Sequence, residues 1–172
     1  MKTKILLNIL FAFFITSCLA QNNRIENALT ACTYEAFSDN GIAFKNKISS
    51  YQNLLIKEKI ITDPSGKSYL QLLQKFADGK GLNKVPSKFF IAQLQTIESP
   101  NSDKVRECQK ITKNESEQYN NSTFKAFEKV ISNQYSPNSL VVALLKLLIE
   151  EDLELDFYKI RILVLTSKIY ME

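Results

Sequence analysis

Histidine and tryptophan are absent from this 172-residue chain. Without histidine, the Ser–His and Cys–His forms of nucleophilic catalysis are excluded, and the commonest zinc and copper ligand is missing. The three cysteines include no Cys-x-x-Cys pair, the spacing typical of redox centres. No set of catalytic or cofactor-binding residues stands out, so the sequence predicts a non-enzymatic protein with no resident cofactor.

Glycine and proline are also scarce, with four of each in the chain. Their scarcity argues against a turn-rich sandwich or barrel, whereas plentiful Lys, Glu, Gln and Leu favour helices. A hydrophobic content of 45% is enough to furnish a core, and the length suits a single domain. We therefore expect an all-α, single-domain multi-helix bundle over residues 24–172.

The chain has little concentrated positive charge. Its 22 basic residues outnumber 18 acidic ones, but they form no Lys/Arg block or basic stripe, so we expect no nucleic-acid partner. Gly66-Lys67-Ser68 copies the end of a nucleotide-binding P-loop, yet Ile61 stands where the first glycine of that motif belongs. Asp63-Pro64-Ser65-Gly66 is instead typical of a turn before a helix. We expect no nucleotide ligand.

Residues 1–20 have the pattern of an export signal. Lys2 and Lys4 come first, the almost wholly apolar Ile5–Ile15 follows, and small residues end the segment. The apolar stretch is shorter than the roughly 20 residues that span a bilayer. An uncleaved anchor is therefore the less favoured alternative, and the sequence predicts an exported protein.

Two cleavage outcomes compete in this segment. Ile15-Thr16-Ser17-Cys18 resembles a bacterial lipobox, in which the cysteine is acylated and becomes the new N-terminus, so Cys18 is the lipidation candidate. Ordinary cleavage after Ala20 is the alternative, and a short polar lead, 21–23, would then begin the mature chain. The first outcome predicts a lipoprotein held at the membrane by its lipid, and the second a periplasmic or secreted protein.

Cys32 and Cys108 remain as a pair once Cys18 is lipidated or removed. Outside the cytosol such a pair is expected to form a disulfide. In the chain-entropy model, closing so long a loop contributes about 4 kcal/mol to stability. The alternative is two unpaired buried thiols.

The central element predicted by the sequence is Leu140–Ile149, ten residues interrupted only by Lys146. We expect a buried helix there, started by Ser136–Ser139. The last segment, 153–171, fits a helical face and a strand alternation equally well. We favour the helix, because a lone strand would leave its backbone groups unpaired.

Other segments show the apolar spacing of amphipathic helices. They cover 24–37, 42–60, the residues before the stop at 78–81, 87–98, 103–118 and 123–135. In the segment 103–118, the spacing predicts that Val105, Cys108 and Ile111 face the interior.

Five carboxylates lie in the seven residues Glu150–Asp156. Such a cluster could bind calcium or supply a general acid and base, but it lacks the glycine turn and alternating ligands of a calcium loop. A solvated turn between two helices is the simpler interpretation. A carboxylate-dependent hydrolase and a calcium-responsive protein remain as alternatives to a binding or assembly module with a protein partner in the envelope.

The signal segment, Asp63–Leu70 (DPSGKSYL) and Ser136–Lys159 together resemble exported proteins related to the periplasmic portions of ExbD/TolR-like biopolymer-transport components. The resemblance covers about a third of the chain. It implies an exported envelope protein. Members of that family use an uncleaved membrane anchor with an acidic residue that couples to proton flow. Residues 1–20 contain no Asp or Glu, so proton coupling and functional residues are not carried over.

Overall fold

The computed structural model describes residues 24–79, 87–133 and 135–169. These residues form eight α-helices and two short 3-10 helices, with no strand among them. They are α2 (Ile25–Glu35), α3 (Ile42–Lys57), α4 (Gly66–Ala77), α5 (Ser87–Leu94), α6 (Ser102–Glu115), η1 (Tyr119–Asn121), α7 (Thr123–Ser132), α8 (Pro137–Leu147), η2 (Asp152–Glu154) and α9 (Asp156–Ile169). The prediction of an all-α multi-helix bundle is confirmed.

The predicted signal segment 1–20, its lipobox 15–18 and the polar lead 21–23 lie outside the described residues. Within the ranges that are described, none of the helices combines the length and the apolar character that crossing a bilayer demands.

Polar residues begin four of the helices. Each cap accepts a hydrogen bond from a backbone amide of the first turn, which satisfies one of the orphan donors there. The caps are Ser65 for α4, Asn101 for α6, Ser122 for α7 and Ser136 for α8. Pro137 occupies the first turn of α8, where its missing N–H leaves no bond unmade. The predicted helix start at 136–139 is confirmed.

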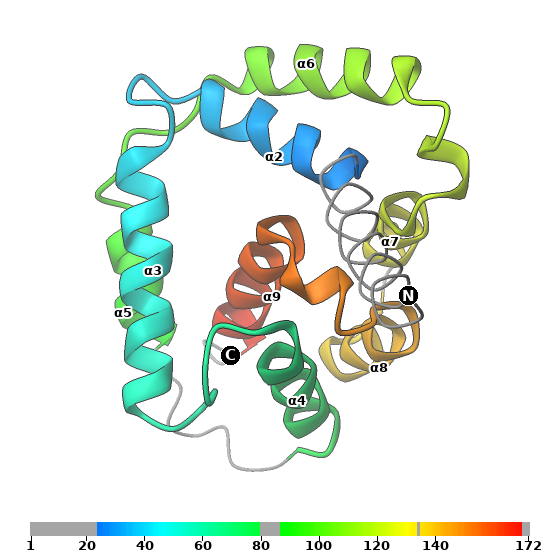
Figure 1. Ribbon diagram of the computed structural model, residues 1–172. Helices are drawn as coiled ribbons and strands as arrows, with labels where there is room; N and C mark the ends of the chain where they lie inside the picture. The colour runs from blue at the N-terminus through cyan, green and yellow to red at the C-terminus, as the bar shows by residue number, and fades with distance from the viewer. Residues whose placement is uncertain (1–23, 80–86, 134, 170–172) are drawn as a thin grey trace, which may run out of the picture.

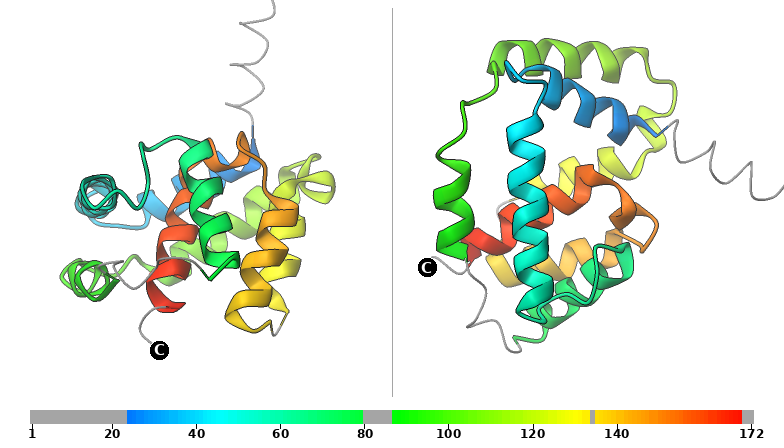
Figure 2. Two further views of the ribbon diagram at one scale, coloured as in Figure 1. Left: turned by 90° about the horizontal axis from the view of Figure 1, so that it is seen from below. Right: turned by 60° about the vertical axis from the view of Figure 1, so that its left-hand side comes forward.

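The helices pack as neighbouring pairs around α9. The pairs are α2 with α6, α3 with α5, α4 with α8, and α7 with α8, and α9 packs on α2, α4 and α5. In Figure 1, α9 lies in the middle of the molecule, and α2, α3, α4 and α7 surround it. Figure 2 shows α4 and α9 between the α3–α5 pair on one side and the α7–α8 pair on the other. The last described helix is therefore the central one.

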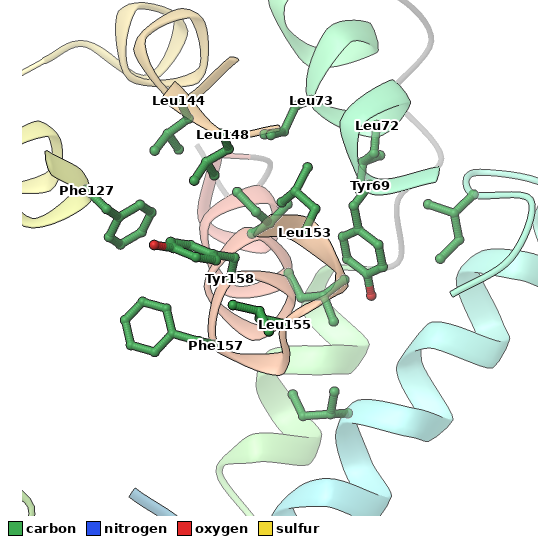
Figure 3. Close-up of a cluster of buried hydrophobic side chains, with 14 of the residues drawn as sticks. Tyr69, Leu72, Leu73, Phe127, Leu144, Leu148, Leu153, Leu155, Phe157 and Tyr158 are labelled. Carbon is green, nitrogen blue, oxygen red and sulfur yellow. The ribbon is translucent and has the colours of Figure 1, made fainter. Parts of the chain in front are cut away.

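Side chains of α9 form the middle of the hydrophobic core. Phe157, Tyr158, Ile162 and Leu163 are at most 1% exposed. Around them pack residues of η2, α4, α7 and α8, among which Figure 3 labels Tyr69, Leu72, Leu73, Phe127, Leu144, Leu148 and Leu153. Phe127 makes edge-to-face contacts with both Phe157 and Tyr158, an arrangement that aromatic quadrupoles favour.

The prediction that 140–149 is the buried central helix is wrong. Val141 and Leu144 are buried, but Val142 is 38% exposed and Ile149 is 57% exposed. Helix α8 packs one face on α4 and α7, and its other face meets water. An apolar residue can lie outside as well as inside, so an uninterrupted apolar run does not by itself place a helix at the centre.

The last segment is a helix, as favoured, and the strand alternative is wrong. Its polar residues do not prevent burial, because they bond within the helix or to near neighbours. Thr166 and Ser167 donate to the carbonyls of Leu163 and Val164. Lys159 pairs with Glu154 at 3.2 Å. These internal bonds remove the penalty for burying polar groups.

The predicted Cys32–Cys108 disulfide is present and joins α2 to α6. Cys32 is buried, whereas Cys108 is only half-buried. The prediction that Val105, Cys108 and Ile111 face the interior is wrong, because α6 has no buried residue and Ile111 is 48% exposed. Helix α6 lies along the outside of α2 (Figure 1), and one neighbouring helix cannot cover a full face.

Candidate functional site

A buried ionic network joins the beginning of α2 to η2 and α9. Nη2 of Arg24 lies 2.8 Å from Oε1 of Glu26 and 2.7 Å from Oδ1 of Asp152. The Tyr158 hydroxyl donates to Glu26 Oε1 at 2.7 Å. Glu26 is 1% exposed and Asp152 is 3% exposed. Buried charges are tolerated when each finds partners, and here every charge has them.

The network shifts the pKa values of its members. Burial alone would raise the pKa of Glu26, but hydrogen bonds from Arg24 and Tyr158 hold it below its ordinary value of 4.5. Burial, and then the hydrogen bond to Glu26, raise the pKa of Tyr158. Glu26 therefore stays ionised between two donors, and the network links distant parts of the fold.

The acidic segment 150–156 does not gather its carboxylates at one point. Besides its ion pair with Arg24, Asp152 accepts a hydrogen bond from the Ile149 amide at 3.1 Å. Glu154 accepts from the Gly66 amide at 2.6 Å and from Lys159 at 3.2 Å. Over the described ranges, no group of three or more His, Cys, Asp or Glu residues could hold a metal ion. Asp152 and Glu154 are thus each bonded to groups of other elements.

The P-loop-like segment at Gly66 is a packing contact. The Gly66 amide at the start of α4 bonds to the Glu154 carboxylate, which takes the place that an anion could occupy at a helix N-terminus. A Cβ on Gly66 would lie 2.1 Å from the carbonyl oxygen of Glu150. Nearby, hydrogen bonds from Ser65 and Ser68 lower the pKa of Asp63 to about 2. The segment forms the turn and helix cap that the sequence predicts.

An apolar cleft of about 390 Å³ opens between α2, α3, α7, α8 and α9. Its walls are Thr30, Thr33, Tyr34, Phe44, Phe127, Ile131, Leu144, Ile160, Arg161, Ile162, Val164 and Leu165. The volume falls in the range of about 300–1,000 Å³ that is usual for small-molecule sites. Because the walls are mostly apolar and come from five helices, the cleft has the character of a ligand site and is the candidate functional site.

Few polar groups in the cleft are available to a ligand. Thr30 and Thr33 donate their hydroxyls to carbonyls of their own helix, at 2.8 and 3.2 Å. Burial, and then the charge and hydrogen bond of Asp156, raise the pKa of Tyr34 to about 12. The remaining polar group is the guanidinium of Arg161.

Arg161 lies against the wall of the cleft. Its guanidinium carbon is 3.3 Å from the centre of the Phe157 ring, and Nη1 donates to the Phe157 carbonyl at 2.9 Å. Burial lowers the pKa of Arg161 to about 10, so the group remains charged at neutral pH. Ring stacking and one hydrogen bond hold the cation in place without neutralising it.

The predicted site residues are placed as follows: Cys32 and Cys108 are joined, Cys18 lies outside the described residues, and none of them lines the cleft. Sequence analysis missed the cleft and Arg161. One signal was available, namely Arg161 flanked by Ile160 and Ile162.

No protein-family model matches the chain, and neither a curated protein nor a solved structure matches it. The function is therefore inferred from the cleft itself.

Proposed function

We propose that this protein is an exported, non-catalytic binding module of the cell envelope, and that the apolar cleft is its binding element. The observation that carries the proposal is the cleft of about 390 Å³ between five helices. A well-formed apolar cavity with few polar groups is the usual form of a ligand site.

The lining residues favour binding over catalysis. They include no carboxylate, cysteine or histidine, so the cleft lacks the nucleophile and base pair that covalent catalysis uses. Both threonine hydroxyls are bonded to backbone carbonyls. Arg161 can bind and orient an anion, but it cannot act as a base at neutral pH.

Export is proposed from the N-terminal pattern, with lipidation at Cys18 as the favoured form. Only residues 19–23 separate Cys18 from Arg24, and Arg24 is fixed by the buried ionic network. A connection this short spans at most about 20 Å when extended. A lipidated protein would therefore be held close to the membrane surface, with the attachment next to Arg24 and its ionic network.

The test is mass spectrometry of the protein recovered from the membrane and soluble fractions of its native host. Denaturing spectra should give the mass of a chain that begins at an acylated Cys18, with Cys32 and Cys108 alkylated only after reduction. Native spectra should show a bound molecule that leaves on denaturation.

The outcomes separate the parts of the proposal. An unlipidated chain beginning at Gln21 would contradict the tether and leave a diffusing exported binder. A chain with an intact segment 1–20 recovered from the cytosol would contradict export. Absence of any bound molecule, together with no affinity for the neutral apolar dye Nile red, would contradict the binding function.

A further inference from the structure

Within the part of the chain that the structure describes, Arg161 is a charged group with no carboxylate bonded to it. Among the described residues it makes one hydrogen bond and no ion pair. Glu128 acts on it only through space, because the Glu128 carboxylate is bonded to Lys113 at 2.6 Å and to Tyr119 at 2.9 Å. Asp156 is engaged by Tyr34. The two carboxylates near the cleft, Glu128 and Asp156, are thus bonded to residues other than Arg161.

The contrast with Arg24 shows how unusual this is within the fold. Arg24, also partly buried, has two carboxylates within 2.8 Å. A partly desolvated cation is costly unless it is paired and hydrogen-bonded. At Arg161 the missing partner can come from a ligand, since a guanidinium presents five N–H donors in a fork that fits a carboxylate.

The space next to Arg161 is apolar. Ile160 and Val164 lie one helical turn apart on α9 and share the cleft with Leu165. Phe44 of α3 and Phe127 of α7 also line it, and these two helices lie on opposite sides of α9 (Figures 1 and 2). Ile131, also in the wall, is 46% exposed. A ligand with one anionic end and an apolar body therefore matches this lining.

From this single cation and its apolar surroundings we propose that the cleft binds a free medium-chain fatty acid, with its carboxylate on the guanidinium of Arg161 and its hydrocarbon chain along Ile160, Val164 and Leu165. This inference rests on the proposed binding function and names its ligand class. A partner helix fits less well than a fatty acid. A helix is about 10 Å across, and side chains from five helices enclose the cleft.

The first experiment uses the purified wild-type protein and compares ligands that differ only in the polar end. Dodecanoate and 1-dodecanol are titrated as competitors of 11-(dansylamino)undecanoic acid, whose fluorescence rises in an apolar site. We expect dodecanoate to bind at least tenfold more tightly than dodecanol. From octanoate to dodecanoate, each added methylene should tighten binding about fourfold, as expected for apolar burial.

The second experiment tests Arg161 directly. Arg161→Gln should reduce the preference for dodecanoate over dodecanol to less than twofold and leave dodecanol affinity within about twofold of wild type. Arg161→Lys keeps the charge and should retain most of the preference. Lys146→Gln, an exposed change in α8 outside the cleft, is the matched control and should change neither affinity. Far-UV circular dichroism verifies the fold of each variant.

Equal affinities for dodecanoate and dodecanol in the wild type would overturn the fatty-acid proposal and leave the apolar binding function intact. So would a folded Arg161→Gln variant that keeps the preference. If neither ligand displaces the probe, the cleft is not the binding element, and the proposed function fails with it. Binding of dodecanoyl phospholipid vesicles in place of free dodecanoate would assign the cleft to a membrane and would also overturn the proposal.

Discussion

Gly66 shows how one small residue can fix the packing of two segments. The start of α4 approaches the turn at 150–154 so closely that a Cβ on Gly66 would overlap the Glu150 carbonyl. The same approach allows the Gly66 amide to bond to Glu154, 88 positions later in the sequence. The residue is required here for space, since no side chain fits between the two backbones.

We expect Gly66→Ala to reduce the free energy of unfolding by about 2–3 kcal/mol, because the backbones must separate to admit the methyl group. Urea unfolding followed by circular dichroism measures the loss. The control is Gly79→Asn, at a glycine with φ +65° and open space around it, where asparagine accepts the left-handed conformation. An equal loss at both positions would show that backbone freedom, not packing, explains Gly66.

Glu26 gives a pH-dependent prediction. Its folded-state pKa lies below its ordinary value of 4.5, so its contribution to stability is complete above about pH 4.5 and is lost as the pH falls through the folded-state pKa. We expect Glu26→Gln to cost about 3 kcal/mol at pH 7, since it breaks a buried ion pair. The difference from wild type should shrink below pH 4.5.

Urea unfolding at pH 7, 5, 4 and 3 checks this expectation. Glu35→Gln, at an exposed position near the end of the same helix, serves as the comparison and should have little effect at any of these values. A constant difference between wild type and Glu26→Gln from pH 7 to pH 3 would contradict a role for the ionised carboxylate.

Single residues differ in how far the sequence predicts their roles. The Ser136 cap and Pro137 act within one helical turn, so local chemistry predicts them. Glu26 and Tyr158 are 132 positions apart, and no local pattern indicates their contact. Arg161 was missed for a related reason: an arginine in a helix is usually solvated, and its position over Phe157 depends on how the helices pack.

Among the elements, α6 depends most on a covalent bond. It contributes no buried residue and packs chiefly on α2, to which the Cys32–Cys108 disulfide joins it. An exposed helix with so little apolar contact has a small free energy of local opening.

Removing this bond should release α6 before it disturbs the centre. Replacing Cys32 and Cys108 by serine should lower the global free energy of unfolding by at most about 4 kcal/mol. Hydrogen exchange followed by mass spectrometry should show faster exchange over 102–115 and little change over 156–167. Protection of α6 that survives loss of the disulfide would mean that its contacts with α2 are sufficient.

The apolar spacing predicts which segments form helices, whereas it does not predict how deeply each helix is buried. The apolar spacing correctly predicts most helices, including α4, whose inward face is Tyr69, Leu72, Leu73 and Phe76. The spacing does not predict which of α8 and α9 is the more deeply buried helix. Helix α8 has the more apolar sequence, yet α9 is more deeply buried, because surrounding helices cover α9 from several directions. Such coverage is a property of the assembled fold.

At the scale of the molecule, stability should depend on α9 far more than on α8. Leu163→Ala, at a side chain with no exposure, should cost about 3 kcal/mol through the cavity that it leaves. Val142→Ala, at a side chain 38% exposed, should cost less than about 0.5 kcal/mol. Urea unfolding of the two variants measures both losses, and similar values would contradict the central position of α9.

The central position of α9 also determines when this chain can fold. The ribosome makes η2 and α9 after every other described helix, so the earlier helices are made before the helix at the centre of the core exists. Neither the Glu26–Tyr158 bond nor the Gly66–Glu154 bond can form until then. Until the last part of the chain has been made, the core therefore lacks the buried side chains at its centre, and the complete fold can form only at the end of synthesis.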